Sequence, residues 1–200
     1  MFVITADQVN SREEPDAVGG MIRRLSDGLG AALPLDPDRS AGDEVQVLVP
    51  DADSALRAIL LLTRAREWSV GLGIGSVRLP LGASIRESTG PAFIAARAAV
   101  GRAKGKPSRF AIEGEDARRD VADGEAILDL LLLLRARRSA EGWELHDLVS
   151  QGLTQAQAAE RLGITPQAAS DRARAAELRA EAAATPALVR LLDRLAGEAS

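Results

Sequence analysis

Residues 153–176 read LTQAQAAERLGITPQAASDRARAA, and this stretch predicts two short helices joined by a tight turn. Thr154 is a favourable N-cap, and Gln157 three residues later completes the pattern of a capping box. Gly163 suits the left-handed backbone position that ends many helices. Thr165, which precedes a proline, then predicts the start of a second helix.

Small side chains lie where these two helices would touch. Helices that cross steeply need small residues at their contact, and Ala159 and Ala169 supply them. Ala158 and Leu162 complete the inner face of the first helix, and Ile164 fills the corner between the two. The segment therefore predicts a helix-turn-helix.

A helix-turn-helix usually places its second helix in the major groove of DNA, so we expect DNA as a partner. Glutamine and arginine read base edges well, while Arg172 and Arg179 are candidates for phosphate contacts. The residues of the second helix that we expect at the DNA are Thr165, Gln167, Ser170, Asp171, Arg172 and Arg174. An ordinary helical hairpin stays open as the alternative, because the segment is nearly charge-neutral.

The composition limits the kinds of site that the chain can build. Its formal net charge of −4 gives no overall basic character, so any contact with nucleic acid is expected to be local. The absence of cysteine excludes disulfides and thiolate metal sites, and the single His146 excludes a histidine-rich metal cluster. Aromatic residues make up only 2%, which predicts an aliphatic and largely helical core.

No segment predicts a membrane span. The most apolar run, Leu128–Leu134, contains Asp129 and ends at Arg135, which makes it too short to cross a bilayer. We interpret it as a core or dimer helix. The N-terminal residues lack the basic leader and long apolar segment of a signal peptide, so we expect a cytoplasmic protein without a membrane partner.

Strand and helix patterns alternate in residues 1–113. The predicted strands are Phe2–Ala6, Glu44–Val49, Val70–Val77 and Arg109–Ile112, and the predicted helices are Asp16–Leu33, Ser54–Trp68 and Pro91–Lys104. A further strand before Glu44 stays open. Helices do not follow every strand, which predicts an α/β (α+β) sandwich of ferredoxin-like type. We expect a charged linker at 114–124 and an all-α helix-turn-helix domain at 125–200.

Two aspartates lie at the ends of predicted strands. Asp7 follows the first strand, and Asp43 precedes the second confident one. Two carboxylates that adjacent strands bring together could hold Mg²⁺ or Mn²⁺, which prefer oxygen ligands, and could clamp a phosphoryl group. Two turn-forming aspartates are the alternative, because aspartate is common in turns. The glycines of Val70–Val77 predict close packing against a helix.

The motifs around these aspartates resemble the catalytic domain of class III nucleotidyl cyclases. Asp7 with Ser11 matches the family's D-hydrophobic-x-x-S stretch, and Asp43, preceded by glycine, matches its G-D hairpin. Gly71–Gly75 resembles its R-x-G-I-x-x-G strand, and Gly90–Arg97 resembles its G-x-x-V-N-x-A-x-R helix start. The resemblance implies a cyclase-like fold in which both aspartates bind the catalytic metals.

The resemblance also implies a site for a nucleoside triphosphate, with one important departure. Arg97 matches the family's arginine and would be catalytic if activity remains, and Arg39 lies where many members place a base-selecting lysine. Phe93 stands where the family has its transition-state asparagine, and losing one such donor costs about 10²–10³ in rate. Lys104 and Lys106 are near, but not at, the place of the usual late lysine. We therefore expect little or no cyclisation.

Over nearly its whole length the chain resembles the SatD family, which joins a cyclase-like half to a helix-turn-helix. Asp7–Arg12, Gly42–Glu44 and Gly90–Arg97 carry this resemblance. We expect a DNA-binding transcriptional regulator whose first domain forms a homodimer, with both aspartates facing Arg97 of the second copy, and senses a nucleotide with a divalent metal. An active class III-type nucleotidyl cyclase with a regulatory helical domain is the alternative. An interaction module with neither activity also stays open.

Overall fold

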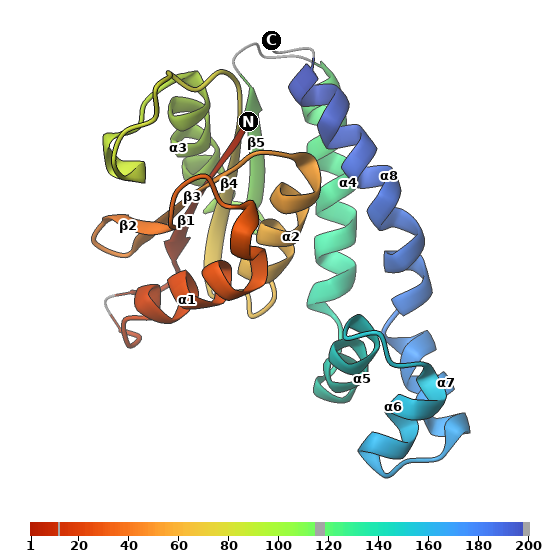
Figure 1. Cartoon of the computed structure of the whole chain (residues 1–200). Helices are drawn as coiled ribbons and strands as arrows, with labels where there is room; N and C mark the ends of the chain where they lie inside the picture. The colour runs from red at the N-terminus through yellow and green to blue at the C-terminus, as the bar shows by residue number, and fades with distance from the viewer. Residues whose placement is uncertain (12, 115–118, 198–200) are drawn as a thin grey trace. The chain divides into compact units, whose positions relative to one another are not determined.

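The computed structural model describes residues 1–11, 13–114 and 119–197 (Figure 1). The chain divides into two compact units. The first contains Met1–Leu132 and the residues from Leu188 onward, and the second contains Leu133–Ala187. The division falls inside two long helices, α4 (Arg119–Ala136) and α8 (Leu178–Gly197), so each of these helices contributes to both units.

The first unit is built on a five-stranded mixed sheet with the spatial order β2-β3-β1-β4-β5. Neighbouring strands are antiparallel except β4 and β5, which are parallel. Together with the helices this confirms the expected mixed α/β class. The strands are β1 (Phe2–Gln8), β2 (Asp38–Ala41), β3 (Glu44–Val49), β4 (Trp68–Ile74) and β5 (Phe110–Gly114).

Two glycines bring a helix against this sheet. The helix α3 (Pro91–Ala103) contacts β4, β5 and β1. A Cβ on Gly71 would lie 2.2 Å from the backbone nitrogen of Val100, and one on Gly73 would lie 2.1 Å from the carbonyl oxygen of Ala92. The predicted close packing of these glycines on a helix is therefore confirmed. The other helices of the α/β layer are α1 (Val18–Leu29) and α2 (Ala52–Leu62), and short 3₁₀ turns cover Gly30–Ala32 and Ile85–Glu87.

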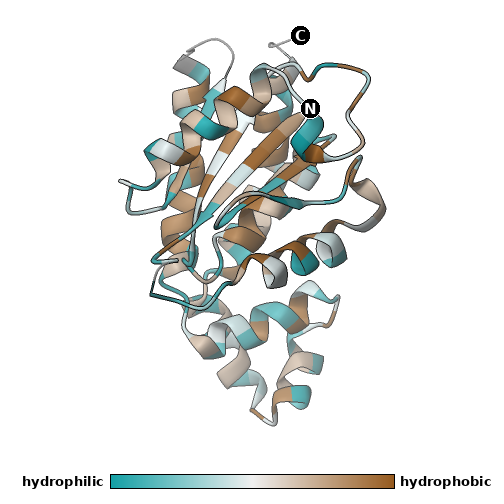
Figure 2. Ribbon diagram, turned by 90° about the vertical axis from the view of Figure 1, so that its left-hand side faces the viewer, coloured by the Kyte–Doolittle hydropathy of each residue, from teal (hydrophilic) through white to brown (hydrophobic). Residues whose placement is uncertain are grey.

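The two faces of β1 differ in chemistry. Residues of a strand alternate between faces, so Thr5 and Asp7 share the face of Gly71, which lies opposite Thr5 and packs on α3. On the neighbouring strand β3, Gln46 lies opposite Thr5 and Glu44 lies opposite Asp7. The Gln46 amide donates to the Thr5 hydroxyl at 3.2 Å. The residues on the other face, Phe2, Ile4 and Ala6, belong to the buried apolar core. Figure 2 shows hydrophobic bands, in brown, along the strands, together with paler and teal bands.

Several predicted boundaries move for local reasons. The helix predicted to reach Trp68 ends at Leu62. A turn follows it, in which Arg66 has φ +59°. Trp68 is fully buried and begins β4 instead. The helix predicted at Asp16–Leu33 covers only Val18–Leu29 and ends at Gly30, whose φ is +54°. The strand left open before Glu44 is β2.

The predicted linker at 114–124 differs from the structure. Residues 115–118 lie outside the described residues, and α4 already runs from Arg119. The Glu125 carboxylate fixes this helix to the α/β layer, because it accepts from the Ile112 N–H at 2.7 Å and pairs with Arg102 and Lys106 at 2.5 and 2.6 Å. Burial opposes ionisation of Glu125, but these donors outweigh it and lower its pKa. The first part of α4 therefore belongs to the first unit, rather than to a domain that begins at residue 125.

In the second unit, α5 (Ala140–Ser150), α6 (Gln155–Leu162) and α7 (Pro166–Ala175) stand between the ends of α4 and α8 along the chain. Their shared core is built mainly from alanine, with Leu145 and Leu178 as larger members. Small side chains allow the backbones to approach closely, so these short helices form a compact group. None of the described helices is long and apolar enough to cross a membrane.

Candidate functional site

The helices α6 and α7 have the caps that the sequence predicts. The Thr154 hydroxyl accepts from the Gln157 N–H at 3.2 Å, and the Gln157 side chain accepts from the Thr154 N–H at 2.9 Å, which completes a capping box. Gly163 adopts the left-handed conformation at φ +65°. The Thr165 hydroxyl accepts from the Ala168 N–H at 3.1 Å, so this predicted DNA contact also serves as the cap of α7.

Alanines form the contact between the two helices, as predicted. Ala158 and Ala159 of α6 and Ala169 of α7 are buried in one cluster. Leu162 and Ile164 are partly buried against this cluster. The cluster and the caps together fix the angle at which α7 leaves the turn, and they leave its opposite face exposed.

Asp171 organises the exposed face of α7. The Gln167 amide donates to the Asp171 carboxylate at 3.3 Å, and Arg174 Nη1 lies 3.2 Å from Asp171 Oδ1. Gln167, Asp171 and Arg174 are exposed, and Ser170 is half-buried between them along the helix. Exposed pairs of this kind are worth little in water, so the glutamine and arginine side chains can turn to a ligand at small cost.

Arg172 does not share this face. Its guanidinium lies 3.6 Å from the Glu144 carboxylate of α5, and its side chain is only 29% exposed. It is two residues from Arg174, which places the two side chains on opposite sides of a helix. Arg172, which is predicted to contact phosphate, therefore has an acidic neighbour within the helical unit.

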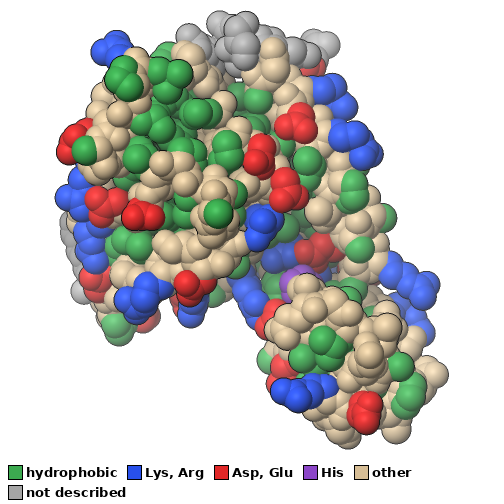
Figure 3. Space-filling view, in the orientation of Figure 1, with side chains coloured by type: hydrophobic (Ala, Val, Ile, Leu, Met, Phe, Trp, Pro, Cys, Tyr) green, Lys and Arg blue, Asp and Glu red, His purple; other side chains and the backbone are tan. Residues whose placement is uncertain are grey.

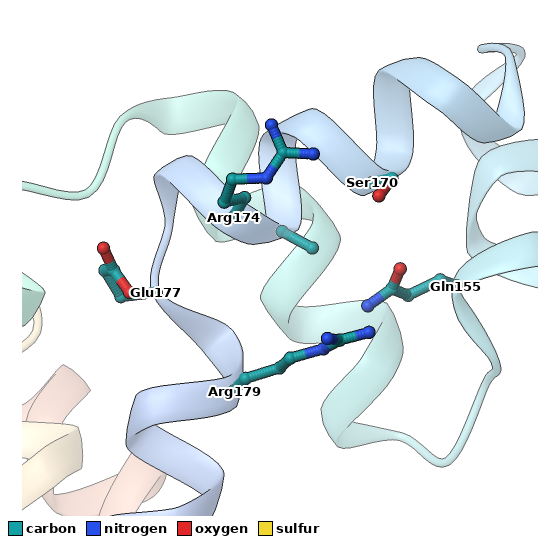
Figure 4. Close-up of a pocket in the computed structure, with 6 residues that line it drawn as sticks. Gln155, Ser170, Arg174, Glu177 and Arg179 are labelled. Atoms are coloured by element: carbon teal, nitrogen blue, oxygen red, sulfur yellow. The ribbon is translucent and has the colours of Figure 1, made fainter.

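A hollow of about 200 Å³ lies beside the exposed face of α7 (Figure 4). The side chains of Gln155 and Arg179 point toward one another in it, while Arg174 comes from α7 and Glu177 lies on the far side. The structure gives Arg179 no ion pair among the described residues. The hollow is therefore rich in hydrogen-bond donors, which suits an anionic oxygen such as that of a phosphate. It is lined by Gln155, Ser170, Ala173, Arg174, Glu177 and Arg179.

A buried ion cluster lies behind α7, and the sequence reasoning missed it. Arg135 and Arg138 both pair with Glu181, the latter pair at 2.5 Å. Arg138 also donates to the carbonyl oxygen of Ala176 at 2.8 Å, at the end of α7. The ring of Trp143 lies 4.8 and 4.4 Å from the two guanidinium carbons. The only sequence signal is a pair of arginines, three residues apart, at the end of an apolar helix.

His146 borders this cluster. Its ring meets Trp143 edge-on with 5.1 Å between centroids, and its Nε2 lies 3.6 Å from Oε1 of Glu181. Burial lowers the pKa of His146, and the charges of Arg135 and Arg138 act in the same direction against the opposing effect of Asp147. The ring is therefore mostly neutral near pH 7.

The two predicted metal-binding aspartates lie at the same end of neighbouring strands. The Gln8 N–H donates to the carbonyl oxygen of Asp43 at 3.1 Å, and Gly42, at φ +50°, turns the hairpin. Asp7 lies directly opposite Glu44, a carboxylate that the sequence reasoning did not assign. The Ser11 hydroxyl donates to the Asp43 carboxylate, and Arg12 of the same motif lies outside the described residues.

Basic side chains already engage the acidic groups of this region. Lys104 Nζ lies 2.7 Å from the Asp7 carboxylate and so occupies one side of this predicted metal ligand. Among the described residues, no three acidic or histidine side chains gather to hold a metal. The aspartates offer suitable oxygen ligands, but a divalent ion fits here only if it displaces Lys104.

The predicted nucleotide-binding arginines have partners within their own chain. Arg97 lies 3.4 Å from Glu44, and Arg39 lies 2.5 Å from Asp16 and donates to the Gly42 carbonyl. Arg97 also lines a groove of about 670 Å³ beside α3, where Phe93 supplies an apolar wall. Arg39 thus links the hairpin to Asp16, just before α1, and Arg97 opens onto a cavity.

Comparison with known proteins adds no further assignment. The chain matches no protein-family model, no curated protein and no solved structure.

Proposed function

We propose that the chain is a cytoplasmic DNA-binding transcriptional regulator that contacts DNA through α7. The observation that carries this proposal is the joint geometry of α6 and α7: two capped helices, a left-handed glycine in the turn and an alanine contact. In proteins with this arrangement the second helix enters the major groove, with polar side chains at its exposed face. Gln167, Ser170 and Arg174 supply such a face here.

Each polar side chain has a distinct role in this proposal. Gln167 and Arg174 read base edges, since glutamine pairs well with adenine and arginine with guanine. In the free protein Asp171 contacts both side chains, with the Gln167 amide at 3.3 Å and Arg174 Nη1 at 3.2 Å, and these exposed pairs give way to DNA at small cost. Arg179, in the hollow next to α7, takes a backbone phosphate and so contributes affinity without specificity.

Charge in the helical unit is mixed rather than basic. Figure 3 shows cationic and anionic side chains interspersed over its visible face. Few phosphates are therefore neutralised, and the logarithm of the binding constant should fall only gently with the logarithm of the salt concentration. Contacts to the base edges must then provide most of the discrimination between target and other DNA sequences.

For the α/β unit we propose a ferredoxin-like, cyclase-like domain that dimerises and senses a nucleoside triphosphate with Mg²⁺ or Mn²⁺. The strand order β2-β3-β1-β4, with antiparallel neighbours, supports the fold assignment. A ligand site in this unit is supported by two observations: Asp7 and Asp43 lie at the same end of neighbouring strands, and a groove lies beside Arg97. Phe93 and the Lys104–Asp7 pair argue against the alternative, an active class III-type cyclase.

Selection from a pool of random DNA duplexes tests the proposal. Wild-type protein should enrich one sequence family over successive rounds. A double variant, Gln167→Ala with Arg174→Ala, should enrich none, while its thermal unfolding stays like that of the wild type because both side chains are exposed. Equal enrichment by the two proteins would refute a role for α7 in reading DNA.

A further inference from the structure

The hollow beside α7 contains polar side chains that the chain itself does not use. Gln155 of α6 and Ser170 of α7 are half-buried, and Arg179 of α8 is exposed. Among the described residues, these three side chains have no hydrogen-bond or ion-pair partner. Figure 4 shows Gln155 and Arg179 pointing toward one another, with Ser170 on the neighbouring helix. Three helices therefore present unused hydrogen-bond donors to one concave surface.

The size of the hollow limits what it can hold. Its volume of about 200 Å³ is smaller than the roughly 300–1,000 Å³ of most pockets that bind drug-sized ligands. Of the six residues that line it, only the buried Ala173 is apolar. The hollow therefore suits a compact ligand that is held by polar atoms, rather than one with a large apolar body.

The charges around the hollow favour an anion. Arg174 and Arg179 line it with two guanidinium groups, whereas Glu177 supplies one carboxylate. Arg174 already lies 3.2 Å from Asp171, so Arg179 is the cation that is open to a ligand. The planar guanidinium group offers several N–H donors in a fixed geometry, which matches the oxygens of a phosphate.

A free phosphate fits these charges better than a phosphate of the DNA backbone does. A phosphate monoester has three strong acceptor oxygens and a charge of about −1.5 to −2 near pH 7. Each phosphate of the DNA backbone carries a single negative charge and is held within a long polymer. Inorganic phosphate shares the chemistry of the monoester and is the smaller ligand.

We propose that the hollow binds a free phosphate dianion, and that this anion competes with DNA for Arg179. Its oxygens accept from the guanidinium group of Arg179, the amide of Gln155 and the hydroxyl of Ser170. The bound dianion also places negative charge beside α7, where it repels the DNA backbone. The competition rests on the proposed DNA-binding function, whereas the binding of the free anion does not.

NMR titration of the full chain with inorganic phosphate tests the site. The side-chain amide signal of Gln155 should shift with phosphate, and chloride at equal ionic strength should not shift it. Arg179→Ala should weaken the binding at least about tenfold, because charge-assisted hydrogen bonds are the strong ones. Glu177→Gln should strengthen the binding, since it removes the carboxylate that lines the hollow. Arg190→Ala removes an equal charge from an exposed position of α8 and should leave the dissociation constant unchanged.

Two results would overturn the site: wild-type affinity no higher than that of Arg179→Ala, or equal losses in Arg179→Ala and Arg190→Ala. Either result would leave only a general attraction of anions to surface charge. A parallel titration with glycerol phosphate distinguishes the two sources of the ligand. Tighter binding than that of inorganic phosphate would assign the hollow to a monoester, and weaker binding would assign it to inorganic phosphate.

Fluorescence anisotropy with a DNA duplex enriched by selection tests the competition. At constant ionic strength, replacing chloride by phosphate should raise the dissociation constant of the wild type for the duplex, and should change that of Arg179→Ala little. An equal rise in both proteins would overturn the competition, because screening by salt acts on both alike. If phosphate binds and no duplex is enriched, the proposed function and the competition fail while the anion site stands. If a duplex is bound and phosphate is not, the inference fails while the proposed function stands.

Discussion

Nη2 of Arg138 lies 2.5 Å from Oε2 of Glu181, and both side chains are buried in the helical unit. Glu181 also accepts from Arg135, so one carboxylate pairs with two guanidinium groups. Because Arg138 also bonds the carbonyl oxygen of Ala176, this cluster ties the end of α7 to α8. The orientation of the proposed DNA-reading helix therefore depends on ion pairs that DNA never touches.

Removing the carboxylate should strongly destabilise the helical unit. Glu181→Gln removes the negative charge that pairs with both buried guanidinium groups, and breaking a buried pair in this way costs about 3–5 kcal/mol. Urea unfolding followed by helical circular dichroism measures the loss. Glu160→Gln, at an exposed position of α6, is the matched control. A loss no larger than that of the control would mean that the cluster does not stabilise the fold.

His146 should make this stability depend on pH. Its pKa is lowered by burial, so between that lowered value and about 6.5 the unfolded chain binds more protons than the folded one. The contribution of the neutral His146 to the free energy of unfolding is therefore present above about pH 6.5, and it is lost as the pH falls toward the lowered pKa. The difference in unfolding free energy between wild type and His146→Gln should shrink from pH 7.5 to pH 5. A difference that stays constant would contradict the assignment.

Gly71 should tolerate no side chain. A Cβ there would lie 2.2 Å from the Val100 nitrogen and 2.5 Å from the Ala96 oxygen, both backbone atoms of α3. Gly71→Ala should therefore cost about 3 kcal/mol or more, at the upper end of the overpacking range. Gly101→Ala, with open space around its Cβ, should instead stabilise α3 by up to about 1 kcal/mol. Equal stabilities for the two variants in urea would contradict the close packing.

The acidic pair makes a separate prediction for nucleotides. Titration calorimetry should detect ATP or GTP binding only with Mg²⁺ or Mn²⁺, and Asp43→Ala should abolish it. Lys104→Ala should strengthen the binding, because it frees the Asp7 carboxylate for the metal. Robust production of a cyclic nucleotide would show that the enzyme alternative is correct and that Phe93 matters less than we propose.

Local features of the fold could be predicted, and distant pairings could not. The capping box at Thr154 and the glycine turn at Gly163 depend on neighbours within a few residues, so the sequence pattern contains them. Lys104 meets Asp7 across 97 positions of sequence, and Arg135 meets Glu181 across 46. Nothing in one sequence fixes such a pairing, since it depends on how strands and helices pack. For the same reason the sequence does not predict the contact between Arg172 and Glu144.

A titration with DNA measures whether α7 reads the base sequence. Fluorescence anisotropy at fixed salt gives the dissociation constants for the enriched duplex and for a scrambled duplex. The wild type should bind the enriched duplex more tightly than the scrambled one. Arg174→Ala should weaken specific binding by about 1–3 kcal/mol and leave scrambled binding nearly unchanged. Arg190→Ala removes an equal charge from an exposed position on α8 and should change neither. Equal affinity of Arg174→Ala and wild type for the enriched duplex would contradict the account.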